Sequence, residues 1–128
     1  MPETMTITHK DTALAFLKLC AAGKPREAFQ KYTGPGLRHH NAYFAGSAEA
    51  LIGGMEQSAR EHPRTSLEAK QVIEEGDRVA VFSHVHMEPE DRGIAVVHIL
   101  RFAGKKIVEF WDVGQPVPEH SPNELGVF

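Results

Sequence analysis

The sequence predicts an α+β protein in which helices cover one face of a curved antiparallel sheet. Apolar residues recur at helical spacing in the first half of the chain and alternate as in strands in the second half. Helices followed by a run of strands are the α+β pattern. A curved sheet closed over by N-terminal helices forms a cone, and we expect a cavity inside it.

Three helices are expected in the first half of the chain. Asp11 complements the dipole at the start of the first helix, Pro25 opens the second at its first position, and Ser47 is a good N-cap for the third. The expected helices are 10–22, 25–32 and 47–61. Residues 37–43 are expected to form either a short strand or an ordered turn.

A meander of four antiparallel strands is expected in the second half. Turns at Gly76 and Gly104, and a polar loop at 89–93, separate consecutive strands. Prolines after Gln115 make the tail irregular from about residue 116. The expected strands are 65–74, 78–88, 94–102 and 107–115, with no helix between 78 and 113.

Length and composition limit the class of protein. The 128 residues suffice for one domain, 1–128, with ordinary apolar (41%) and charged (24%) fractions. The net charge of −3 does not favour nucleic acid as a partner. Apolar runs fall far short of the ~20 residues of a membrane span. The single cysteine and an N-terminus unlike a signal peptide predict a cytoplasmic protein.

His98 and Asp112 are the candidate catalytic pair. Each lies among apolar neighbours on its own strand face, and the turn at Gly104 and Lys105 falls near the midpoint between them. The two side chains should therefore be cross-strand neighbours. A carboxylate beside an imidazole in an apolar cavity suits general acid–base chemistry near neutral pH. The alternatives are a structural hydrogen bond and a metal site.

Other polar residues are weaker candidates. His84 and His86 share a strand face and are expected to point into the cavity or reach its rim. They could hold a metal, but no cluster at ligand spacing accompanies them, so no metal site is predicted. In His39-His40-Asn41, alternate side chains of an extended segment point to opposite sides, so one or two can face inward. The expected lining comprises His40, Asn41, Phe82, His84, Val96, Leu100 and Phe110.

An apolar outer face of the sheet predicts a homodimer. A sheet exposing such a face would leave too large an apolar patch on a monomer. Two-fold pairing through this face would cover the patch. The residues expected on the outer face are Val79, Val81, Val85, Trp111 and Val113.

Several segments together resemble the SnoaL-like family of the nuclear-transport-factor-two-like superfamily. They are the Pro-opened second helix, His40-Asn41 before the third helix, the stretch from Gly104 to Gln115 (GKKIVEFWDVGQ) and the tail SPNELGVF. The resemblance covers essentially the whole chain, and its tail is similar to that of members labelled as aldol-condensation catalysts. It implies a cystatin-like α+β cone with a deep apolar pocket, no cofactor and a homodimer formed through the sheet.

The resemblance also implies roles for particular residues. In the polyketide cyclases of the family, an Asp on the last long strand is the general acid/base, and Asp112 matches it. His98 matches a pocket histidine, and Asn41 matches a pocket asparagine. The family often has a histidine two residues before the Asp, where this chain has Phe110, so the pocket floor is more apolar here.

Two kinds of function follow. One is a cofactor-independent enzyme in which Asp112 removes a proton α to the carbonyl of a small apolar compound. His98, helped by Asn41 or His84, then stabilises the enolate, as in isomerisation, aldol closure, dehydration or hydrolysis. The other is a non-catalytic small-ligand-binding or dimerisation module that uses the same pocket.

Overall fold

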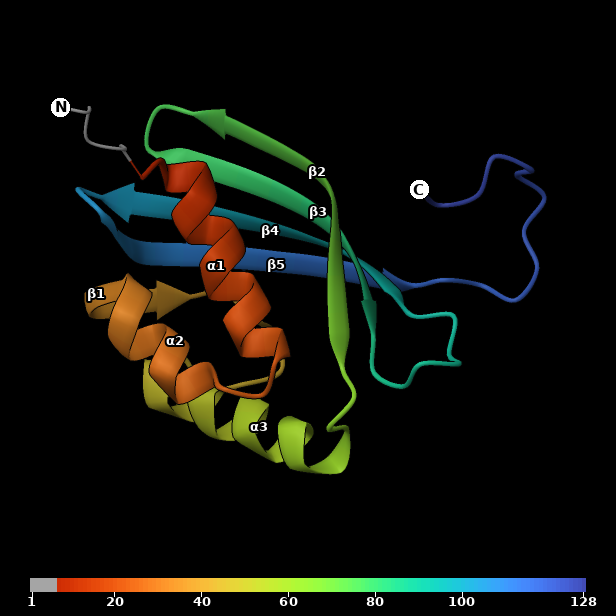
Figure 1. The fold of residues 1–128 in the computed structure, drawn as a ribbon, viewed down its shortest axis with the longest axis horizontal. Coiled ribbons are helices and arrows are strands. Elements are labelled where there is room, and N and C mark those ends of the chain that lie inside the picture. The colour runs from red at the N-terminus through yellow and green to blue at the C-terminus, as the bar shows by residue number, and fades with distance from the viewer. Residues whose placement is uncertain (1–6) are drawn as a thin grey trace, which may run out of the picture.

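The computed structural model describes residues 7–128, so the first six residues of the N-terminal segment examined for a signal peptide lie outside the described residues. Three helices precede most of a five-stranded sheet (Figure 1). The helices are α1 (His9–Ala21), α2 (Pro25–Tyr32) and α3 (Ala48–Glu61). The strands are β1 (Thr33–His39), β2 (Ser66–Glu75), β3 (Arg78–His86), β4 (Ile94–Ala103) and β5 (Lys106–Pro116).

Local signals account for the helix boundaries. Thr8 and Asp11 form a capping box at the start of α1, with the Thr8 hydroxyl accepting from Asp11 N at 3.1 Å. Pro25 begins α2, and the Ser47 hydroxyl caps α3 by accepting from Ala50 N at 3.1 Å. The three predicted helices are confirmed to within about one residue at each end.

The sheet has the strand order β1-β5-β4-β3-β2. The four predicted strands are confirmed, and they pair antiparallel in sequence order. At one edge of this mostly antiparallel sheet, β1 pairs parallel with β5. This strand answers the question left open for residues 37–43, although it begins earlier, at Thr33. Gly36 adopts a φ of 72° where the β1–β5 register shifts.

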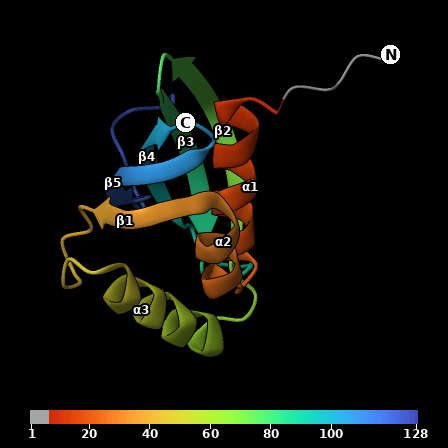
Figure 2. The same cartoon turned by 90° about the vertical axis from the view of Figure 1, so that its left-hand side faces the viewer.

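All three helices lie on the concave side of the sheet. Figure 2 shows α1 against one side of the strands, with the tail after β5 on the other side. The register of β2 with β3 shifts between Ala69 and Gln71. The first half of β2 starts near the end of α3 and bends away from the second half (Figure 1). Bulges of this kind bend a strand, so this shift helps to curve the sheet into the expected cone.

The core fills the narrow part of this cone. Phe16 of α1 packs edge-on against Phe29 of α2 at 5.1 Å between ring centroids, and it meets Phe110 of β5 at 5.9 Å. Leu100 and Ile107 lie beneath these rings and are fully buried. Leu100 is thus part of the packed core, and it does not line the cavity described below.

The two faces of β3 are the reverse of those expected. Val81 is paired with His98 on the inner face, and alternate residues of a strand share a face, so Val79 and Val85 face inward as well. Val79 and Val81 are fully buried, and Val85 lines the cavity. The prediction that these three valines lie outside is therefore wrong. Both faces of β3 carry apolar residues, so strand alternation alone did not distinguish them. The exposed apolar residues on the outer face include Ile73, Val97, Ile99 and Val113.

The proline-containing tail has no regular structure after Pro116, as predicted. It returns to the outer face at its end, where the Phe128 ring stacks on His84 at 4.3 Å and meets Phe82 at 5.4 Å. Within residues 7–128, no helix is long and apolar enough to cross a membrane.

Leu100→Ala tests the core assignment. Removing a fully buried leucine side chain leaves a cavity, so we expect the free energy of unfolding to fall by about 2–5 kcal/mol. Urea denaturation measures the change. Leu125→Ala, at a tail position that is 83% exposed, is the control and should change stability by about 0.5 kcal/mol or less. Equal effects of the two substitutions would contradict the assignment.

Candidate functional site

A cavity of about 350 Å³ lies between α1, α3 and the inner face of the sheet. Its lining is mostly apolar. Phe16 and Cys20 come from α1, Met55 comes from α3, and Val96 and Phe110 come from the strands. Cavities of about 300–1,000 Å³ lined in this way are typical of small-molecule sites.

Asp112 and His98 both line this cavity. They are directly opposite one another in the β4–β5 ladder, so the predicted hairpin register is confirmed. The Asp112 carboxylate accepts a hydrogen bond from Asn41 Nδ2 at 2.9 Å through Oδ2. The structure therefore brings together a carboxylate, an imidazole and an amide, all at the edge of an apolar space.

Burial favours the neutral form of the His98 imidazole. Burial lowers the pKa of His98, and the nearby Asp112 carboxylate opposes that effect. Among the described residues, two buried polar atoms have no hydrogen-bond partner. They are His98 Nδ1 and the hydroxyl oxygen of Ser83, which lies on the same face of the sheet. A buried polar atom without a hydrogen-bond partner costs stability, so these two atoms weaken the fold near the cavity.

His39 organises the segment that carries Asn41. Its Nε2 donates to the carbonyl oxygens of Ala45 (2.9 Å) and Ser47 (3.1 Å). Its Nδ1 accepts from the backbone N–H of Asn41 at 3.2 Å. These partners require the neutral tautomer protonated at Nε2. His39 is 7% exposed, and its buried ring ties both ends of the 40–47 loop together.

His40 lies on the outer side of the sheet and not among the cavity residues. Its Nε2 donates to the Glu109 carboxylate at 2.7 Å, and its ring stacks on Trp111 with centroids 5.0 Å apart. Arg101 donates to the same carboxylate at 2.9 Å. The hydrogen bonds from His40 and Arg101 hold the pKa of Glu109 below its usual range.

Phe82 and His84 are also on the outer face, against Phe128. His84 Nε2 donates to the Arg92 carbonyl at 2.7 Å, and His86 Nδ1 donates to the Asp91 carboxylate at 2.9 Å. Neither histidine reaches the cavity or its rim, contrary to expectation. Residues 7–128 contain no group of three or more His, Cys, Asp or Glu side chains placed to hold a metal ion.

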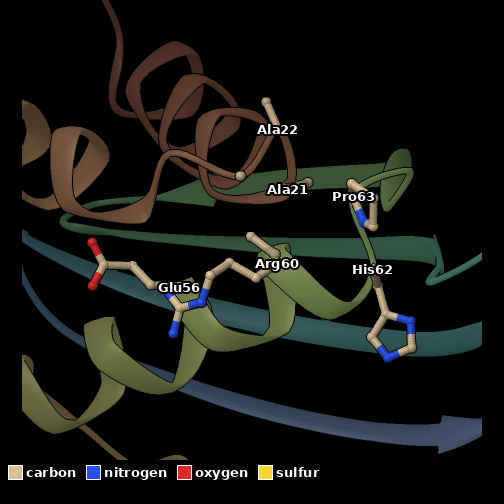
Figure 3. Close-up of a pocket in the computed structure, with 8 residues that line it drawn as sticks. Ala21, Ala22, Glu56, Arg60, His62 and Pro63 are labelled. Atoms are coloured by element: carbon tan, nitrogen blue, oxygen red, sulfur yellow. The ribbon is translucent and has the colours of Figure 1, made fainter.

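A second hollow, of about 450 Å³, lies outside the cavity where α1 and α3 end (Figure 3). Ala21 and Ala22 line it from α1 and the residue after it, and Glu56 and Arg60 line it from α3. Its walls are short side chains and solvated charges, and it contains none of the predicted site residues. We therefore take the smaller, apolar cavity as the candidate functional site.

Several cavity residues are absent from the sequence prediction. Phe44 and Gly54 line the space, as do Leu51 and Met55 of α3. The apolar face of the third helix was a usable signal for Leu51 and Met55, since that face had to cover the sheet. Phe44 is an aromatic residue in a loop, and only its position in space shows what it contacts.

Comparison with known proteins identifies the family. Residues 13–110 match the SnoaL-like domain. The chain belongs to the SnoaL-like family. No curated protein matches it. The match covers both helical and strand segments, and it ends at Phe110, two residues before Asp112.

Solved structures share the fold of this SnoaL-like protein. AclR, a candidate hydroxylase from Streptomyces galilaeus, is 25% identical, with 84% of this chain and 88% of AclR covered and a TM-score of 0.69. A candidate SnoaL-like polyketide cyclase from Jannaschia sp. CCS1 is 17% identical, with coverages of 90% and 92% and a TM-score of 0.69. A cystatin-fold protein from Novosphingobium aromaticivorans is 18% identical, with coverages of 84% and 99% and a TM-score of 0.70.

His98 should make the stability of this SnoaL-like protein depend on acid. Because burial lowers the pKa of His98, the unfolded chain binds more protons than the folded protein below the ordinary histidine pKa of about 6.5. The free energy of unfolding should therefore fall as the pH decreases through that value. One group contributes at most about 1.4 kcal/mol per pH unit.

Urea denaturation between about pH 7 and pH 5 measures this slope. His98→Gln should show a shallower decline than the wild type. His120→Gln removes an exposed tail histidine and is the control, with the wild-type slope expected. Parallel curves for wild type and His98→Gln would contradict the neutral, buried assignment.

Proposed function

We propose that this protein is a cofactor-independent general acid/base enzyme acting on a small, largely apolar carbonyl compound. The observation that carries the proposal is the Asp112 carboxylate on the wall of an apolar cavity, with His98 opposite it and Asn41 bound to Oδ2. Asp112 takes the proton α to the carbonyl. An apolar wall excludes water and strengthens such electrostatic interactions.

Asn41 and His98 have different roles in this proposal. Asn41 orients the base, because its amide engages one carboxylate oxygen and leaves Oδ1 to receive the proton. His98 stabilises the enolate oxygen by donating a hydrogen bond from its imidazole, which lines the cavity opposite Asp112. Such a donor is worth about 3–4 kcal/mol in the transition state. His84 has no part in this step, since it lies on the outer face.

The same enolate is the first intermediate of isomerisation, aldol closure and some dehydrations. Candidate polyketide cyclases from Jannaschia and Bacillus cereus share this fold, at 17% and 18% identity. Phe110 packs against Phe16 and Phe29 at the cavity floor, and an apolar floor favours a substrate with few polar groups. The shared fold supports the chemistry of the first step and leaves the substrate open.

A non-catalytic binding module is the second candidate. The observation that favours it is the hydrogen bond from Asn41, which gives Asp112 a fixed partner as in a structural polar pair. In that case the cavity would bind a small apolar ligand without turnover. The two candidates differ in what happens when the carboxylate is replaced.

Asp112→Asn separates these functions. If Asp112 is the base, the variant should lose solvent deuterium exchange at the α-carbon of a probe ketone such as 2-tetralone by about 100-fold or more, with its fold intact. NMR measures the exchange, and thermal denaturation measures stability. Asp77→Asn, in the turn between β2 and β3, is the control. Loss of stability without loss of exchange would favour the structural pair.

We also propose a homodimer formed through the outer face of the sheet. Val113 and Ile73 are 74% and 62% exposed, and Val97 and Ile99 lie between their strands. Exposed apolar side chains gathered on one face of a sheet favour an interaction site there. Two copies related by two-fold symmetry would bury it on both sides.

Sedimentation equilibrium tests the dimer. The wild type should sediment at twice the 14.2 kDa mass of the chain. Val113→Glu should shift it to the monomer, because pairing would bury a charge in an apolar contact. Leu125→Glu, at an 83% exposed tail position, is the control and should leave the dimer unchanged. A wild-type monomer at micromolar concentration would overturn the proposal.

A further inference from the structure

Among residues 7–128, Phe44 is the one aromatic side chain that reaches the cavity from a loop. It lies between β1 and α3, is 40% exposed, and still lines the cavity. A side chain that meets both solvent and the cavity forms the boundary between them. Tyr43, its neighbour, is 89% exposed and is not a lining residue.

Gly54 provides the seat for this ring. A methyl group on Gly54 would come within 2.6 Å of Phe44 Cζ and 2.9 Å of Cδ1, closer than such atoms approach. Gly53, the preceding residue in α3, has open space around it. Glycine weakens a helix interior, so the contact with Phe44 supplies a packing reason for the glycine at position 54 and none for the one at 53.

The loop around Phe44 is anchored on both sides. Before it, Asn41 is bound to Asp112 through its side-chain amide, and Asn41 Oδ1 accepts from Tyr43 N at 2.9 Å. After it, the carbonyl oxygens of Ala45 and Ser47 accept from His39. The ring is therefore held on Gly54 by the same loop that orients the Asp112 carboxylate.

We propose that Phe44, seated on Gly54, sets the upper size of the ligand that this cavity accepts. With the ring in place, the space of about 350 Å³ suits a flat molecule of two or three fused rings. Removing the ring widens the opening of the cavity to solvent and admits bulkier molecules. This inference rests on the proposed function only in that a small apolar molecule enters the cavity.

Cys20 measures access to the cavity without any ligand or turnover. It is the single cysteine of the chain and lines the same cavity. Burial raises the pKa of its thiol to about 12, so its reaction is slow in the wild type. Mass spectrometry would follow alkylation by a small reagent, iodoacetamide, and a bulky one, N-(1-pyrenyl)maleimide.

Phe44→Ala should raise the rate with the bulky reagent by about tenfold or more, and the rate with iodoacetamide by less. Gly54→Ala should act in the same direction, because its methyl group displaces the ring. Tyr43→Ala and Gly53→Ala are the matched controls and should react as the wild type does. The double variant that combines Phe44→Ala with Gly54→Ala should be alkylated at the same rate as Phe44→Ala alone, because no ring remains to be displaced.

Gly54→Ala reacting like Gly53→Ala, or an unchanged ratio of the two rates in Phe44→Ala, would overturn the proposal. Phe44→Leu keeps an apolar side chain of smaller size and should give an intermediate ratio, which guards against a variant that fails to fold. A parallel measurement compares binding of 2-tetralone with binding of the four-ring ketone androstenedione. If neither binds while the thiol rates behave as stated, the proposed function fails and the size limit stands.

Discussion

The parallel pairing of β1 with β5 is the constraint on which the site depends. It places His39 beside Phe110, and the ladder continues with a hydrogen bond of 3.0 Å from His40 N to the Phe110 carbonyl. The loop that follows β1 is thereby brought to the edge of the cavity, two residues from Asp112. Asn41 then reaches the carboxylate, and Phe44 reaches α3. Without this edge strand, Asp112 would lack its amide partner and the cavity would lack one wall.

Features set by residues close in sequence could be predicted. Helix boundaries followed from caps and prolines, and the opposition of His98 to Asp112 followed from the position of one turn, because an antiparallel hairpin leaves little freedom of register. The sequence alone therefore predicted that His98 and Asp112 are neighbours. It also predicted Val96 and Phe110 as cavity residues.

Features set by contacts between distant segments could not be predicted from the sequence. β1 contains Gly34, Pro35 and Gly36, which do not resemble a strand, and only its pairing with β5 makes it one. The prediction chose the wrong face of β3 as the inner one. Apolar residues lie on both faces of this strand, the valines on one and Phe82 on the other, so their alternation alone does not show which face is buried. The loop posed a third difficulty, because adjacent histidines go to opposite sides of the sheet: His39 is buried beneath the loop, while His40 binds Glu109.

The polar groups of the cavity and the wall that shapes it come from different parts of the fold. Asp112 and His98 stand on neighbouring strands whose register is set by backbone hydrogen bonds, whereas Met55, Gly54 and Phe44 belong to α3 and the loop before it. Changes to that wall leave the strand ladder intact. Natural variation, or directed evolution, can accordingly change which molecules fit by altering the wall, while Asp112 and His98, the proposed acid–base pair, stay in place.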